Sequence, residues 1–220
     1  MSAPLRVDLV DPSKAFKNAY LLRAQKAAWP STATSADLAY SSLQRVFLGE
    51  RDRRPLIQKL LDTAQDWDRQ CLVLLQDQTA FDAWLFSEIE SICELPFAWS
   101  QKPKKDQAVV MHEHLSFGAA QKFVNLLLKD WWALSKQAIE LGPLCGNLHA
   151  PLDDIVVKFV KRARPTVAVP SSVVYELNKG MYLRLQEVII ELAGELHSDL
   201  GCSRKLNRIE FEQLVWGWIR

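Results

Sequence analysis

The sequence predicts an all-α protein in which two helical lobes flank a cleft. Apolar residues recur at helical spacing along most of the chain, alternating strand patterns are scarce, and only 8 glycines serve 220 residues. About half of the residues are apolar (49%) and 24% are charged, which is the balance of a folded globular chain with a sizeable core. A break near residue 108 divides the chain into an expected N-terminal lobe, 1–108, and an expected C-terminal lobe, 109–220.

The N-terminal lobe is expected to hold four helices. An Asp-Pro-Ser start signal opens the first, over about 11–29, and a proline stops it. The next two cover about 35–49 and 54–70, and the fourth, over 79–94, carries apolar residues at helical spacing. Residues 95–106 contain two prolines and three lysines, so we expect a loop there.

The C-terminal lobe contains the strongest helical pattern in the chain, from about 119 to 141, which a Gly-Pro pair ends. A helix follows from Pro151-Leu-Asp to about residue 164, bounded by a further proline. We expect a long helix over 172–200, bent near Gly180, and a last helix over 207–220.

Composition excludes several classes of protein. A net charge of +1 provides no global field for an anionic partner, so any such partner must meet local basic patches. The 4 cysteines are far apart and form no Cys-x-x-Cys pair with histidines at zinc-binding spacing, so we expect neither a metal nor another cofactor. The N-terminus lacks a secretory signal and no uncharged run reaches the ~18 residues of a membrane span. We expect a cytoplasmic, monomeric protein that does not enter membranes.

Two residues in the C-terminal lobe suggest chemistry. Lys122 is expected in the first turn of its helix, where the positive helix end disfavours an ammonium and favours the free amine of a nucleophile. Asp153 follows Pro151 at the start of the next helix, where an N-cap position holds a carboxylate ionised. A Gly- and Pro-containing connection joins the two helices, so both side chains could face one cleft. A surface lysine and a plain N-cap are the simpler interpretations of the same two residues.

The pattern around these residues resembles the helix-hairpin-helix/Gly-Pro-Asp DNA glycosylase superfamily. The resemblance covers roughly residues 109–220. It consists of a Gly118-containing turn before Lys122, the segment Ala-Pro-Leu-Asp ending at Asp153, and Glu212 four residues before Trp216. The order of these motifs along the chain is most similar to that in the archaeal 8-oxoguanine DNA glycosylase branch. The usual Leu-Pro-Gly-x-Gly hairpin is reduced here to Leu-Ser-Phe-Gly, and the C-terminal acidic residue is Glu rather than Asp.

The resemblance implies an N-glycosylase with abasic-site lyase activity, acting on double-stranded DNA that contains a modified base such as 8-oxoguanine. The base would be flipped out of the duplex, Lys122 would attack the sugar to form a Schiff base, and Asp153 would be the essential carboxylate. The residues expected to contact the substrate are Glu212, Trp216, Gln121, Trp132 and His149. Those expected at the DNA backbone are Gly118, Lys129, Lys158, Lys161 and Arg162.

Other functions remain open at this stage. A glycosylase of this kind could excise deliberately modified bases from phage DNA as an antiviral defence. A non-catalytic helical module that binds DNA or protein is the alternative from a different class. A toxin-like helical ribonuclease is disfavoured because no Arg precedes a His by a few residues on one helix. His112 and His114 lack a third ligand nearby, which disfavours a metal site.

Overall fold

A computed structural model of the protein describes residues 47–48, 77–96, 99–101, 110–134, 146–200 and 205–219. The expected helices over 11–29 and 54–70 lie outside these residues. The expected helix over 35–49 also lies outside them, except at its end, where Phe47–Leu48 forms the strand β1 instead.

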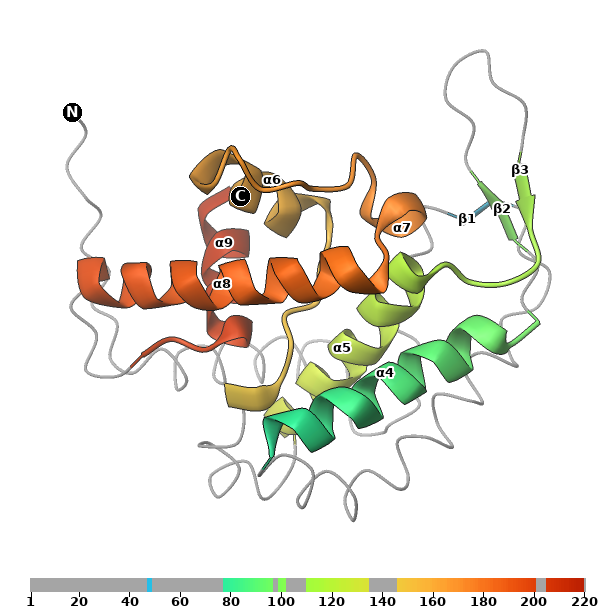
Figure 1. The fold of residues 1–220 in the computed structure, drawn as a ribbon, viewed down its shortest axis with the longest axis horizontal. Coiled ribbons are helices and arrows are strands. Elements are labelled where there is room, and N and C mark those ends of the chain that lie inside the picture. Colours follow the sequence, from blue (N-terminus) through green and yellow to red (C-terminus); the bar gives the residue numbers. More distant parts are fainter. Residues whose placement is uncertain are drawn as a thin grey trace.

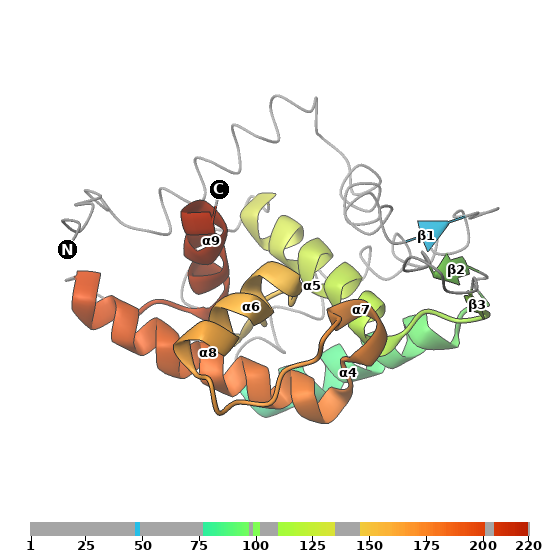
Figure 2. The same cartoon turned by 90° about the horizontal axis from the view of Figure 1, so that it is seen from above.

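The described structure is mostly helical, as the sequence predicts. The helices are α4 (Gln78–Glu94), α5 (Phe117–Leu134), α6 (Asp154–Ala163), α7 (Val173–Glu176), α8 (Lys179–Leu200) and α9 (Arg208–Ile219). In Figure 1, α8 runs across the molecule, with α6 and α7 on one side of it and α4 and α5 on the other. Figure 2 shows the same helices from above, with α9 beside α6 and the strands at one end. Helix α5 packs against both α4 and α7, and α9 packs against both α6 and α8.

A small antiparallel sheet was not expected from the sequence. Its strands are β1, β2 (Trp99–Gln101) and β3 (Val110–His112), in the order β1-β2-β3. Trp99 pairs with His112, and Gln101 pairs with Val110 and with Phe47. The prediction of a loop over 95–106 is therefore wrong at β2. Strands of two or three residues are too short to show an alternating pattern, which explains the error.

The expected long helix over 172–200 is two helices. Its first turn is α7, and α8 begins at Lys179 after an extended Leu177. The break comes before Gly180, where a bend was expected. The Asn178 side chain accepts a hydrogen bond from the backbone N–H of Met181 at 2.9 Å, which caps the start of α8. Asn178 therefore determines where α8 begins.

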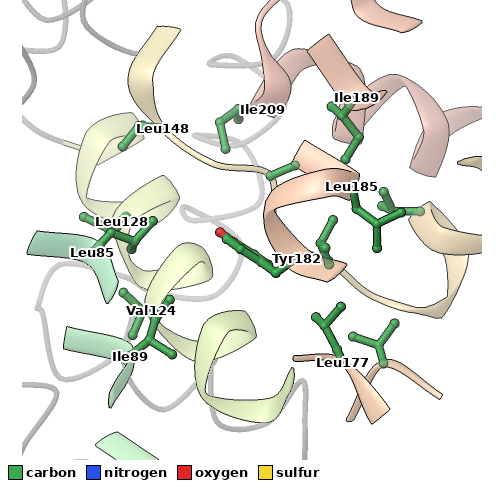
Figure 3. Close-up of a cluster of buried hydrophobic side chains, with 14 of the residues drawn as sticks. Leu85, Ile89, Val124, Leu128, Leu148, Leu177, Tyr182, Leu185, Ile189 and Ile209 are labelled. Atoms are coloured by element: carbon green, nitrogen blue, oxygen red, sulfur yellow. The ribbon is translucent and has the colours of Figure 1, made fainter. Parts of the chain in front are cut away.

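One hydrophobic cluster joins the helices on both sides of residue 108. Phe81, Leu85 and Ile89 of α4 belong to the same buried cluster as Val124 and Leu128 of α5. Figure 3 shows Tyr182 of α8 among these side chains, with its hydroxyl directed into the interior. The described part of the expected N-terminal lobe thus shares its core with the C-terminal segment.

Candidate functional site

Helix α5 begins against α7. Ser116 precedes the helix, and its hydroxyl oxygen accepts a hydrogen bond from the N–H of Ala119 at 3.2 Å. The same hydroxyl donates to the carbonyl of Val174. A Cβ at Gly118 would lie 1.8 Å from the carbonyl oxygen of Val173. Glycine at this position therefore lets the backbones of α5 and α7 approach closely.

Two buried glutamines hold the segment that leads to α6. Gln186 of α8 accepts from the N–H of Ala150 at 3.0 Å and donates to its carbonyl at 2.8 Å. Gln121 of α5 accepts from the N–H of Leu152 at 3.2 Å and donates to its carbonyl at 2.8 Å. Each side-chain amide thus makes the two backbone hydrogen bonds that a neighbouring β-strand would make with one residue. Pro151 lies between the two clamped residues and has no N–H to satisfy.

Asp153 has two separate contacts, one for each carboxylate oxygen. It is the N-cap of α6, and its Oδ1 accepts from the N–H groups of Ile155 at 2.9 Å and Val156 at 3.0 Å. Its Oδ2 lies 4.0 Å from Nζ of Lys122. The side chains of Lys122 and Asp153 are 18% and 12% exposed, so both reach the protein surface. The expected juxtaposition of amine and carboxylate is therefore present.

The start of α5 at Phe117 puts Lys122 in the second turn of the helix. The field of a helix N-terminus falls off within the first turn. The expectation that Lys122 lies in the first turn of its helix is therefore wrong. The carboxylate of Asp153 forms an ion pair with the Lys122 side chain at 4.0 Å.

A second lysine-carboxylate pair lies deeper, on the same face of α5. Lys129 stands two turns after Lys122, and its Nζ lies 3.2 Å from Oε2 of Glu212 in α9. Both side chains are almost fully buried, at 6% and 4% exposed. Burial raises the pKa of Glu212, the charge of Lys129 opposes this rise, and the charge of Asp153 adds to it. Glu212 is thus electrostatically linked to Asp153.

The side chain of His149 is buried between α4 and α8. Its Nε2 lies 3.0 Å from Oδ1 of Asp82, and its Nδ1 lies 2.9 Å from the hydroxyl of Tyr182. Burial lowers the pKa of His149, although the hydrogen bond with Asp82 opposes this effect. The two contacts hold the imidazole between Asp82 of α4 and Tyr182 of α8.

The network continues from Tyr182 back to α5. The amide of Asn125 donates to the Tyr182 hydroxyl at 2.9 Å and to Oε1 of Gln121 at 3.3 Å. Burial raises the pKa of Tyr182, which keeps the hydroxyl protonated as the network requires. A continuous set of contacts therefore runs from Asp82 to the glutamine that clamps Leu152.

Four of the expected substrate and DNA contacts are buried structural residues instead. Gly118 is buried against α7 and therefore does not offer its backbone to a phosphate. Lys129 is buried against Glu212, so it is not a surface cation for DNA. Gln121 is 0% exposed and its amide is fully engaged with backbone and Asn125, and His149 is 1% exposed.

The remaining expected residues lie as follows. Trp216 of α9 is partly buried and packs against the core, and Glu212 lies one turn before it. Lys158, Lys161 and Arg162 are exposed on α6, although Lys161 donates to the carbonyls of Pro165 and Val167. Trp132 belongs to α5, but its side chain lies outside the described residues.

Sequence reasoning missed Gln186, Asn125 and Tyr182. A detectable signal existed for the two amides, because each occupies a position within the apolar stripe of its helix. Gln186 stands between the buried Leu185 and Ile189, four residues after Tyr182. A polar residue in such a stripe needs a buried hydrogen-bond partner, but the pattern does not identify that partner.

Among the described residues, no group of three or more His, Cys, Asp or Glu side chains is arranged to hold a metal ion. Within the same residues, no helix has both the length and the apolar character needed to cross a membrane.

Comparison with known proteins gave no match: no family model, no curated protein and no solved structure matches this chain.

Proposed function

We propose that the protein is a DNA glycosylase that removes a modified base and uses Lys122 as its amine nucleophile. The observation that carries the proposal is the approach of Lys122 Nζ to Asp153 Oδ2, at 4.0 Å, on a partly exposed surface. Capping of α6 occupies Oδ1 of Asp153, so Oδ2 alone is left to face the amine. This division lets one carboxylate both order the helix and take part in proton transfer.

The proposed reaction begins with transfer of a proton from the Lys122 ammonium to Oδ2 of Asp153, and Asp153 regains its charge when it releases that proton to the departing base. The free amine then attacks C1′ of a flipped nucleotide while the N-glycosidic bond breaks, and the base leaves with that electron pair and takes up a proton. Asp153 stabilises the positive charge that develops on the sugar and accepts the proton that the attacking nitrogen loses. Ring opening produces a Schiff base, from which β-elimination breaks the C3′–O bond.

The substrate class rests on the resemblance described above. Lys129 and Glu212 already pair with each other at 3.2 Å and are almost fully buried, so we do not propose them as contacts of the base. We propose a modified purine such as 8-oxoguanine as the first substrate, with Trp216 contributing an aromatic surface.

Base release tests the proposal directly. Duplexes that carry single modified bases, with 8-oxoguanine first, are incubated with wild-type protein and with Lys122→Ala. We expect free base and a nicked strand with the wild type, and no nick with the variant. Release of only a base used in phage DNA modification would support the antiviral alternative. DNA binding without release of any base would contradict the proposal and favour the non-catalytic module.

A further inference from the structure

Gln121 is adjacent to the proposed nucleophile, and Leu152 is adjacent to the proposed carboxylate. The Gln121 side chain pairs with the backbone of Leu152 across the same 31-position interval that separates Lys122 from Asp153. One clamp therefore joins α5 to the segment before α6, immediately beside the two reacting groups. Within the described residues, this clamp connects the helix that carries Lys122 directly to the segment that carries Asp153.

The orientation of the Gln121 amide is determined by its surroundings. Its Nε2 donates to the carbonyls of Gly118, at 3.0 Å, and Leu152, at 2.8 Å. Its Oε1 accepts from the N–H of Leu152 and from the amide of Asn125. Reversal of the amide would bring oxygen against two carbonyl oxygens, so only one orientation is compatible with the site.

We infer that Gln121 is a positioning residue that sets the distance between Lys122 and Asp153, and that the amide of Asn125 holds it in place. This inference rests on the proposed function. Gln121 is 0% exposed and so does not touch a substrate. It acts through the Leu152 backbone, because a displacement of Leu152 moves the carboxylate that follows it. A shift of about 1 Å between reacting groups can change a rate by roughly 100-fold.

Gln186 provides a matched control. It is also a buried glutamine, at 2% exposed, and it makes the same reciprocal pair of hydrogen bonds with Ala150. Ala150 lies three residues from Asp153, whereas Leu152 is its direct neighbour. Methionine at either position keeps the side-chain volume and removes the reciprocal pair of hydrogen bonds with one backbone residue. Gln121→Met also removes the contacts with Gly118 and Asn125, so the excision rates of the two variants are compared under conditions in which both are fully folded.

The test compares wild type, Gln121→Met and Gln186→Met in single-turnover excision at saturating DNA, with the dissociation constant for DNA measured separately. We expect Gln121→Met to lower the saturating rate by roughly 10- to 100-fold, and its dissociation constant to stay within about threefold of wild type because no contact with DNA is lost. Gln186→Met should stay within about threefold in both quantities. Equal rate losses in the two variants would overturn the inference, because they would indicate a general effect of destabilisation. If either methionine variant fails to fold, Gln121→Glu and Gln186→Glu replace the pair with the same expectations.

A structural measurement separates failure of this inference from failure of the proposed function. Crystal structures of wild type and both variants give the distance between Lys122 Nζ and Asp153 Oδ2 without any substrate. If the wild type releases no base, the proposed function fails, and the distance decides the inference by itself. A longer separation in Gln121→Met alone supports it, and an unchanged separation in that variant overturns it.

Discussion

At Gly118 the absence of a side chain determines whether α5 and α7 can pack. The position of a Cβ there is already occupied by the carbonyl oxygen of Val173, a backbone atom that cannot move independently of α7. Gly118→Ala should therefore destabilise the protein by about 1–3 kcal/mol. Chemical denaturation measures the change in the free energy of unfolding.

Gly194 in α8 is the matched control, because a Cβ there would meet nothing within 4 Å. Gly194→Ala should stabilise the protein by roughly 0.5–1 kcal/mol, since alanine restricts the unfolded chain and favours helix. Equal effects of the two substitutions would contradict the close approach of α5 and α7.

The buried pair of Lys129 and Glu212 should limit the stability of the protein. Replacing Glu212 alone with Leu leaves a buried ammonium uncompensated, which should cost about 3–5 kcal/mol. The double variant Lys129→Met/Glu212→Leu should unfold within about 1 kcal/mol of wild type, or be more stable, because desolvation of both charges is avoided. Thermal and denaturant unfolding provide the comparison.

The same double variant should keep base excision, because both side chains are buried and pair with each other rather than with a substrate. Loss of excision in a stable double variant would show that the pair has a role in the reaction. A double variant as unstable as the single one would contradict the desolvation argument.

At the scale of an element, α6 depends on Asp153 for its start and the site depends on the same residue for its charge. Asp153→Asn keeps an oxygen that can accept from Ile155 and Val156, so stability should stay within about 1 kcal/mol of wild type. The charge facing Lys122 is lost, so the rate of base release should fall roughly 10²- to 10⁴-fold. Unfolding and single-turnover excision are measured on the same preparation.

Asp77 is the control for this substitution. It caps α4 in the same manner, with its Oδ1 accepting from Thr79 at 2.8 Å and Ala80 at 3.2 Å. Asp77→Asn should have the same small effect on stability and leave the rate unchanged. A similar loss of rate in both variants would remove Asp153 from the proposed reaction.

At the scale of the whole molecule, DNA association must rely on local charge because the net charge is only +1. Lys158 and Arg162 are exposed one turn apart on α6, the helix that Asp153 begins. If both neutralise phosphates, Lys158→Ala/Arg162→Ala should weaken binding and reduce the slope of log affinity against log salt by about 2. Fluorescence anisotropy over a range of salt concentrations measures the slope.

A charge-matched control is available on α8. Lys179→Ala/Arg184→Ala removes two exposed cations that already pair with Glu90 and Glu187. Its salt slope should equal that of wild type. If both double variants reduce the slope equally, exposed cations in general attract DNA and α6 is not a specific DNA-binding surface.

The sequence was sufficient to predict the helical class, the described helices other than the division between α7 and α8, and the proximity of Lys122 to Asp153. Helical periodicity and a Pro-x-Asp helix start are local signals that can be recognised without knowledge of tertiary contacts. The roles of Gln121 and His149 could not be predicted correctly, because their hydrogen-bond partners are 31 and 33 residues away along the chain. The short strands escaped prediction for a related reason, since β2 and β3 are defined by pairing rather than by pattern.

Covalent trapping tests the central claim, that Lys122 is the nucleophile, most directly. The wild-type protein is incubated with duplex DNA containing 8-oxoguanine, and then with other modified bases, in the presence of borohydride. Peptide mapping locates the reduced adduct. We predict one adduct, on Lys122, which disappears in Lys122→Ala and persists in Lys179→Ala, which removes an exposed lysine of α8. An adduct on another lysine, or base release with no adduct on any substrate, would contradict the account.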